Sequence, residues 1–131
     1  DGESVEYCWD ANLDTVLRVK LRRSIQPGES VIVELEYELD ITETHYRIGH
    51  WKGVTNFLNW YPIVAYFGDA GWMARPFVGW HQPWLNEAGI YHVQLHVPPG
   101  QEVVSSGQTV EVATEQDGSR RYTIVGEGLR D

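Results

Sequence analysis

The chain is poor in cysteine, in long apolar runs and in basic residues, and each shortage excludes a class of protein. Cys8 is the only cysteine in 131 residues, so no internal disulfide and no thiolate metal cluster can form. No apolar run approaches the about 20 residues of a transmembrane helix, and residues 1–4 lack the features of a signal peptide. With 10 Lys and Arg against 19 Asp and Glu, the net charge of -9 argues against a nucleic-acid partner.

The motifs of common catalytic centres are also missing. No histidine precedes a glutamate, so the HExxH zinc motif is absent, as are the GxSxG, GxxxxGK[ST] and GxGxxG motifs. His92 and His96 are four residues apart, but on a strand they would be separated by about 13 Å, too far to share one zinc ion. Ser105 and Ser106 have no adjacent base. We therefore expect no catalytic residue, metal ligand or cofactor in this chain.

One pair of carboxylates remains as a candidate for chemistry. Asp69 and Glu87 lie in the aromatic middle of the chain and could converge as the acid and base of a hydrolase. Nothing in the sequence fixes the distance between them, and solvated or capping roles are commoner for carboxylates in an acidic chain. We expect Cys8 to be a small, half-buried strand residue beside Tyr7 and Trp9.

What the sequence does contain is period-two alternation of apolar and polar residues, bounded by Pro, Gly, Asn and Asp. This pattern predicts short strands and turns. Residues 16–22 and 31–40 alternate in this way around the turn signal Gln26-Pro27-Gly28-Glu29, so we expect them to form a hairpin. In this hairpin Arg22, Lys20 and Arg18 would face Glu34, Glu36 and Glu38, in that order.

Two further segments near the C-terminus are predicted as strands. Residues 90–97 place Tyr91, Val93, Leu95 and Val97 on one face and His92, Gln94 and His96 on the other. Residues 109–115 and 120–125 flank Asp117-Gly118, which favours a tight hairpin turn. A two-residue loop there would place Glu115 opposite Arg120 and Val110 opposite Val125. We predict one all-β domain over residues 1–131, with two packed, mostly antiparallel sheets in a hairpin-rich sandwich or saddle.

The middle of the chain is unusually aromatic. Ten rings fall within residues 51–84: Trp51, Phe57, Trp60, Tyr61, Tyr66, Phe67, Trp72, Phe77, Trp80 and Trp84. Such rings can line a ligand groove, as in carbohydrate-binding sandwiches, or form a face that is buried against another domain. Large rings with a polar tip are enriched where a partner covers a surface, which favours the second interpretation.

These aromatic residues also carry a resemblance. Residues 56–72 (NFLNWYPIVAYFGDAGW), Gly79-Trp80, Pro83-Trp84, residues 86–98 and residues 103–107 resemble the N-terminal β-domain of bacterial M1 family zinc metallopeptidases, which are aminopeptidase N-like. The opening alternation and the turn at 25–29 are similar to the first hairpin of that domain. Residues 126–131 resemble its junction with the thermolysin-like catalytic domain, so the resemblance covers nearly the whole chain.

The resemblance implies a non-catalytic domain that packs on its own catalytic domain and helps form the peptide-substrate cleft. In that family, zinc held by the catalytic domain activates a water molecule that attacks the peptide carbonyl; the HExxH and Gly-x-Met-Glu-Asn motifs of that domain have no match here. The residues expected near the substrate are Asn56, Phe57, Asn59, Trp60 and Tyr61. The alternatives are a free-standing carbohydrate- or ligand-binding β-sandwich that uses the Trp cluster, and a hydrolase built on Asp69 and Glu87.

Overall fold

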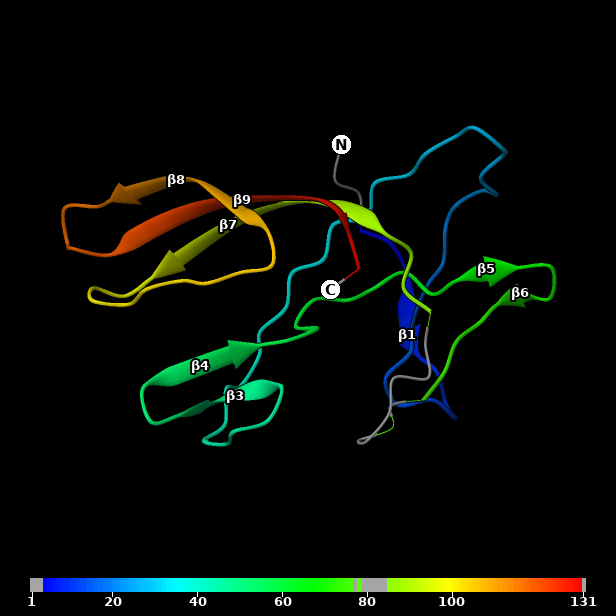
Figure 1. The fold of residues 1–131 in the computed structure, drawn as a ribbon. Helices are drawn as coiled ribbons and strands as arrows, with labels where there is room; N and C mark the ends of the chain where they lie inside the picture. Colours follow the sequence, from blue (N-terminus) through cyan, green and yellow to red (C-terminus); the bar gives the residue numbers. More distant parts are fainter. Residues whose placement is uncertain (1–3, 77, 79–84, 131) are drawn as a thin grey trace. The chain divides into compact units, whose positions relative to one another are not determined.

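The computed structural model describes residues 4–76, 78 and 85–130. Within these residues the chain contains nine strands and no helix, and the strands form four small sheets with antiparallel pairing (Figure 1). The prediction of an all-β, mostly antiparallel, hairpin-rich fold is confirmed, with the strands divided among four sheets where we expected two. No helix of the described residues could span a membrane. The chain divides into two compact units, Asp1–Leu85 and Asn86–Asp131.

The first sheet of unit Asp1–Leu85 pairs β1 (Tyr7–Trp9) with β2 (Leu17–Val19), so that Cys8 lies opposite Arg18. The predicted pairing of residues 16–22 with residues 31–40 is therefore wrong. Carboxylates on either side of β1 meet two of the cations that we expected to face residues 31–40. The ion pairs are Arg18 with Asp10 at 2.5 Å and Lys20 with Glu6 at 2.9 Å.

Cys8 lies on β1 as predicted, but it is exposed and not half-buried. Its strand neighbours Tyr7 and Trp9 are 69% and 63% exposed. The prediction was wrong because β1 belongs to a two-stranded sheet, and the described residues provide no second layer that covers it.

Two more hairpins follow in this unit. β3 (Ile48–Trp51) and β4 (Val54–Phe57) are joined by Lys52 and Gly53, whose φ angles of 48° and 81° match the type I′ turn that suits strand twist. β5 (Phe67–Gly68) and β6 (Gly71–Trp72) form a shorter hairpin. Each of these hairpins joins two strands that are consecutive in the sequence. Each sheet therefore contains only those two strands.

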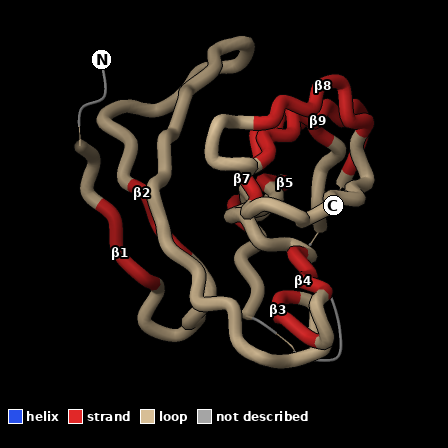
Figure 2. Tube along the Cα trace, turned by 90° about the vertical axis from the view of Figure 1, so that its left-hand side faces the viewer, coloured by secondary structure: helices blue, strands red, loops and turns tan. Residues whose placement is uncertain are grey.

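The unit Asn86–Asp131 contains one three-stranded sheet in the order β7 (Gly89–Val97), β9 (Arg120–Leu129), β8 (Gln108–Thr114). Figure 2 shows β8 and β9 running side by side. The side chains of β7 alternate strictly between half-buried and exposed, which confirms the strand and the two faces that we predicted for residues 90–97.

The core of this unit lies on β9. Among the described residues the buried apolar side chains are Tyr122, 4% exposed, and Ile124, 6% exposed. Tyr122 lies between Leu95 of β7 and Val112 of β8, and Ile124 lies opposite Val93. The Tyr122 hydroxyl donates to Glu102 Oε2 at 3.3 Å. This contact ties the loop before β8 to the core.

The hairpin between β8 and β9 forms at the predicted place but in a different register. Thr114, and not Glu115, lies opposite Arg120. The loop is longer by one residue because the amide of Gly118 donates to the Glu115 carbonyl and Gly118 takes a φ of 83°, as in a turn that ends in a left-handed bulge residue. A second irregularity between Thr109 and Glu111 shifts the pairing again. The predicted pairing of Val110 with Val125 is therefore wrong too, because the bulge leaves Gln108 opposite Val125.

Gly107 gives a test of this packing. A Cβ at this position would lie 2.8 Å from Ile124 Cγ2 and 2.9 Å from the Val125 carbonyl oxygen, so the backbone would have to move. We expect Gly107→Ala to reduce the stability of the sheet by about 1 to 3 kcal/mol, measured by amide hydrogen exchange on β9. Gly89→Ala is the control, because a Cβ there makes only ordinary contacts of 3.5 Å or more. Equal effects of the two substitutions would contradict the predicted clash.

Candidate functional site

The region predicted to lie near a substrate begins on β4 and continues through the turn after it. Asn56 and Phe57 are the last residues of β4. Asn59 takes a left-handed conformation with φ 53°, which Asn adopts more readily than most residues, and so turns the chain at the end of the hairpin. Trp60 and Tyr61 follow this turn and are half-buried.

Three of these five residues form a chain of ring contacts. The rings of Phe57 and Trp60 are 6.4 Å apart at 69°, and those of Trp60 and Tyr61 are 5.6 Å apart at 86°. Both pairs have the edge-to-face geometry that aromatic quadrupoles favour. Asn56 makes a separate contact, because its Nδ2 donates to the Tyr46 carbonyl at 3.5 Å. The structure thus gathers the rings of Phe57, Trp60 and Tyr61 into an apolar surface, whereas the Nδ2 contact of Asn56 is directed to Tyr46.

Tyr37 connects this surface to an earlier segment, a contact that sequence reasoning did not find. Its hydroxyl donates to the Trp60 carbonyl at 3.4 Å. Partial desolvation raises the pKa of Tyr37 above its ordinary value, because the phenolate would lose some of its solvation. The hydroxyl therefore keeps its proton at neutral pH and remains a donor.

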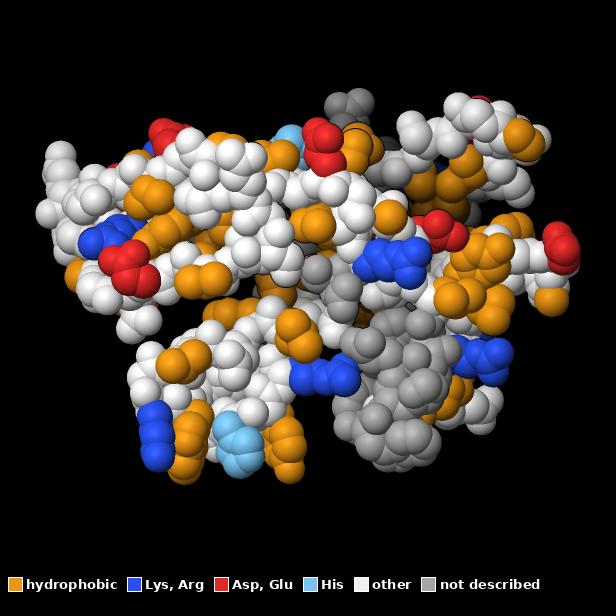
Figure 3. Space-filling view, viewed as in Figure 1, with side chains coloured by type: hydrophobic (Ala, Val, Ile, Leu, Met, Phe, Trp, Pro, Cys, Tyr) orange, Lys and Arg blue, Asp and Glu red, His pale blue; other side chains and the backbone are white. Residues whose placement is uncertain are grey.

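A second aromatic pair lies on the β5–β6 hairpin. Phe67 and Trp72 are cross-strand neighbours with ring centroids 4.9 Å apart, and they are 63% and 59% exposed. Figure 3 shows hydrophobic side chains at the surface over this hairpin. Trp51 at the tip of β3 is 43% exposed, with Lys52 Nζ 5.8 Å from its ring centroid. Three rings of the predicted cluster, Phe77, Trp80 and Trp84, lie outside the described residues.

The polar candidates are exposed side chains, and Asp69 and Glu87 belong to different units. Asp69 is exposed in the turn between β5 and β6, and Glu87 is exposed at the start of the other unit. His92 and His96 point from exposed positions of β7, a strand as predicted. Across residues 4–76, 78 and 85–130, no three His, Cys, Asp or Glu side chains are grouped closely enough to hold a metal.

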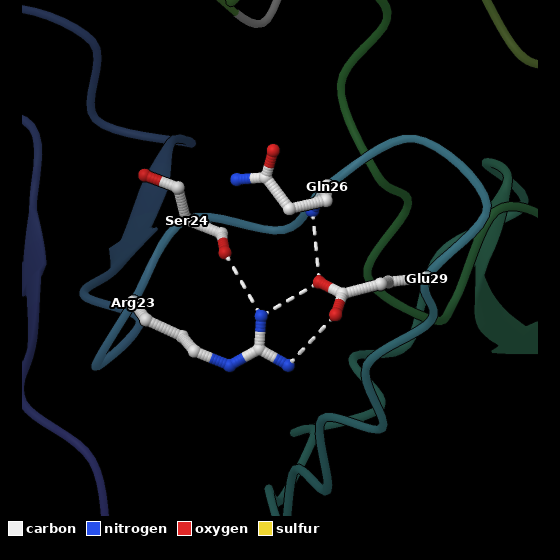
Figure 4. Close-up of polar contacts among 4 residues, drawn as sticks. All are labelled: Arg23, Ser24, Gln26 and Glu29. Carbon is white, nitrogen blue, oxygen red and sulfur yellow. Dashed lines mark hydrogen bonds and ion pairs between the residues drawn. The ribbon is translucent and has the colours of Figure 1, made fainter.

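An ordered turn at residues 23–29 also escaped sequence reasoning (Figure 4). Arg23 reaches the Glu29 carboxylate with both terminal nitrogens, at 2.6 and 3.3 Å, and the Gln26 amide donates to the same carboxylate at 2.9 Å. The signal was present, since an arginine and a glutamate flank the Pro27-Gly28 turn.

This turn is expected to open in acid. Hydrogen bonds from Arg23, and then from the Gln26 amide, hold the pKa of Glu29 below its ordinary value of 4.5. Because the folded-state pKa is the lower one, the carboxylate stabilises the turn fully above pH 4.5, and this contribution is lost as the pH falls through the lowered pKa. Carbon-detected NMR titration of Glu29 should give a midpoint below 4.5, and Arg23→Gln should raise it. A midpoint that Arg23→Gln leaves unchanged would contradict the contact.

Comparison with known proteins identifies no relative. No protein-family model, no curated protein and no solved structure matches the chain.

Proposed function

We propose that this chain is the non-catalytic N-terminal β-domain of an M1-like zinc aminopeptidase, which packs on the catalytic domain and helps form the peptide-substrate cleft. The zinc, the attacking water and the catalytic residues belong to that other domain. In the sequence, the proposal is supported by the resemblance of residues 56–72 to the N-terminal β-domain of M1 family metallopeptidases. In this role the rings of Phe57, Trp60 and Tyr61 would border the substrate.

The structural observation that carries the proposal is how little apolar surface the described residues of the unit Asp1–Leu85 bury. Each of its sheets in the described residues has only two strands, and an isolated two-stranded hairpin is marginally stable in water. Large apolar side chains remain exposed on the β3–β4 and β5–β6 hairpins, among them Trp51, Phe57, Phe67 and Trp72. Apolar surface that is left on a domain in this way is typical of a face that a partner covers.

Amide hydrogen exchange tests this proposal. In the isolated 131-residue chain, the amides of β1 to β6 should exchange quickly, while those of β7 to β9 are protected by the three-stranded sheet. In the natural full-length protein, exchange from β3 to β6 should slow by at least about tenfold, because an adjoining domain covers these hairpins. The proposal fails if β3 to β6 exchange equally fast in both proteins.

A second function is favoured by one specific observation, the exposed pair Phe67 and Trp72. Exposed rings on a hairpin offer the kind of stacking surface that carbohydrate-binding sandwiches use. Titration of the isolated chain with polysaccharides should then change its tryptophan fluorescence, and Trp72→Ala should abolish that change. An unchanged spectrum at saturating polysaccharide would exclude this function.

A further inference from the structure

Residues 31–40 form an elongated segment without a strand partner (Figure 1). Every residue of the segment is exposed. In the described part of the chain, none of its amide or carbonyl groups takes part in a backbone–backbone hydrogen bond. The segment therefore offers a row of free donors and acceptors, which is the property that lets a strand accept another strand at its edge.

The side chains of this segment separate into two rows with period two. The apolar row is between 40% and 50% exposed and consists of Val31, Val33, Leu35, Tyr37 and Leu39. The acidic row consists of Glu34, Glu36, Glu38 and Asp40. A strand that pairs here would meet an apolar surface on one face and consecutive negative charges on the other.

The acidic row has no cation of its own in the described residues. Three of the cations that precede the segment are engaged elsewhere: Arg18 pairs with Asp10, Lys20 with Glu6 and Arg23 with Glu29. No ion pair of the four acidic side chains is found among the residues that the structure describes. A bound segment with positive charge at every second position would therefore supply the counter-charges that the acidic row lacks among the described residues.

We propose that residues 31–40 are a docking strand for an extended, cationic peptide segment of another protein. The bound segment carries Lys or Arg at alternate positions, opposite the acidic row, and apolar residues between them, against the apolar row. Its backbone pairs with the free groups of residues 31–40. A second copy of this chain fits less well. Pairing of the segment with itself brings acidic side chains opposite acidic side chains, and the complementary basic strand β2 of the chain is already paired with β1.

Contacts near both ends of residues 31–40 already restrain the conformation of this segment. The turn before it is held by Arg23 and Glu29 (Figure 4). Near its other end, the Tyr37 hydroxyl is bonded to the Trp60 carbonyl. Ordering a flexible strand opposes binding, so a segment that is already held at two points loses less conformational freedom when a peptide pairs with it.

The test uses the 131-residue chain and a blocked peptide, acetyl-KIRVKIRV-amide, which alternates basic and apolar residues in the required way and does not occur in this chain. We expect saturable one-to-one binding by fluorescence anisotropy, weaker at high salt because exposed charges are screened. Hydrogen exchange should slow within residues 31–40 when the peptide binds. Glu34→Gln, Glu36→Gln and Glu38→Gln together should weaken binding about tenfold, since three opposite-charge pairs are lost.

Two controls separate docking from general attraction to an acidic protein. The matched variant carries Asp14→Asn, Asp69→Asn and Glu87→Gln, which remove the same charge from exposed side chains elsewhere; it should bind as the parent chain does. A peptide with N-methyl groups on alternate amides keeps its charges but loses backbone donors, and should not bind.

The remaining outcomes overturn the proposal. They are the absence of saturable peptide binding, and an equal loss of affinity in the two triple variants. They are also equal affinity for the N-methylated peptide, and slowed hydrogen exchange that appears outside residues 31–40 when the peptide binds. Two results with the free chain also overturn it. Residues 31–40 already protected from exchange in the monomer would mean that the chain pairs with itself, and dimerisation that the Glu34, Glu36 and Glu38 substitutions change would mean that a second copy is the occupant.

Discussion

Replacing Tyr122 by alanine is expected to lower the free energy of unfolding of the three-stranded sheet by about 3 to 5 kcal/mol, as for other buried aromatic residues. Tyr122 is 4% exposed on the central strand, between Leu95 and Val112. Its removal leaves a cavity at the centre of the sheet. It also removes the hydroxyl that holds Glu102 and the loop before β8.

Hydrogen exchange on β7 and β9 is the appropriate measurement, because the unit Asn86–Asp131 contains no tryptophan and fluorescence would report on the other unit. Tyr122→Phe is the control. It keeps the ring and loses only the hydroxyl contacts, so a loss of about 1 kcal/mol is expected. If Tyr122→Ala costs no more than Tyr122→Phe, the assignment of this ring as the core is wrong.

Replacing Phe67 and Trp72 together by serine is expected to weaken association with the catalytic domain about 100-fold, under the function proposed above. Each ring is exposed in the described structure and available to a partner. Aromatic residues at the centre of an interface commonly contribute about 2 kcal/mol or more when truncated, although the effects of two neighbours do not add fully. The measurement is titration of the chain against the downstream segment of the natural protein, expressed separately.

Tyr7→Ser is the matched control for that double substitution. Tyr7 is 69% exposed, comparable with Phe67 at 63%, but it lies on β1, outside the aromatic middle. It should leave association unchanged. Equal affinities for the double variant and the parent chain would place the interface elsewhere on the domain.

The C-terminal strands could be predicted from sequence because local pattern and turn chemistry agree there. Residues 90–97 alternate without interruption, and Asp117-Gly118 marks the turn between the last two strands. The register was missed because it depends on two backbone details, the left-handed Gly118 and the irregularity between Thr109 and Glu111. Side-chain alternation does not encode either of these.

The predicted pairing of residues 16–22 with residues 31–40 was wrong for a different reason. The rows of charge on residues 16–22 and 31–40 are complementary, but complementarity does not exclude another partner. Glu6 and Asp10 satisfy Lys20 and Arg18 when β1 pairs with β2. Ion pairs between exposed side chains are weak, commonly below about 1 kcal/mol, so they select poorly between two possible strand pairings.

The candidate site was predictable in part. The concentration of rings in residues 56–61 was visible in sequence, and Phe57, Trp60 and Tyr61 do contact one another in series. The left-handed turn at Asn59 and the Tyr37 hydroxyl on the Trp60 carbonyl were not visible, because each depends on backbone conformation or on a contact between distant segments.

The most direct test of the proposed function is to determine the natural protein that contains these residues, by intact-mass and peptide-mapping mass spectrometry, and to measure its zinc content. We predict a longer polypeptide in which residue 131 is followed by a segment with the HExxH motif, and which binds one zinc ion per chain and removes N-terminal residues from peptides. A natural protein without that segment, or one whose aminopeptidase activity resides in the isolated 131-residue chain, would contradict the proposed function.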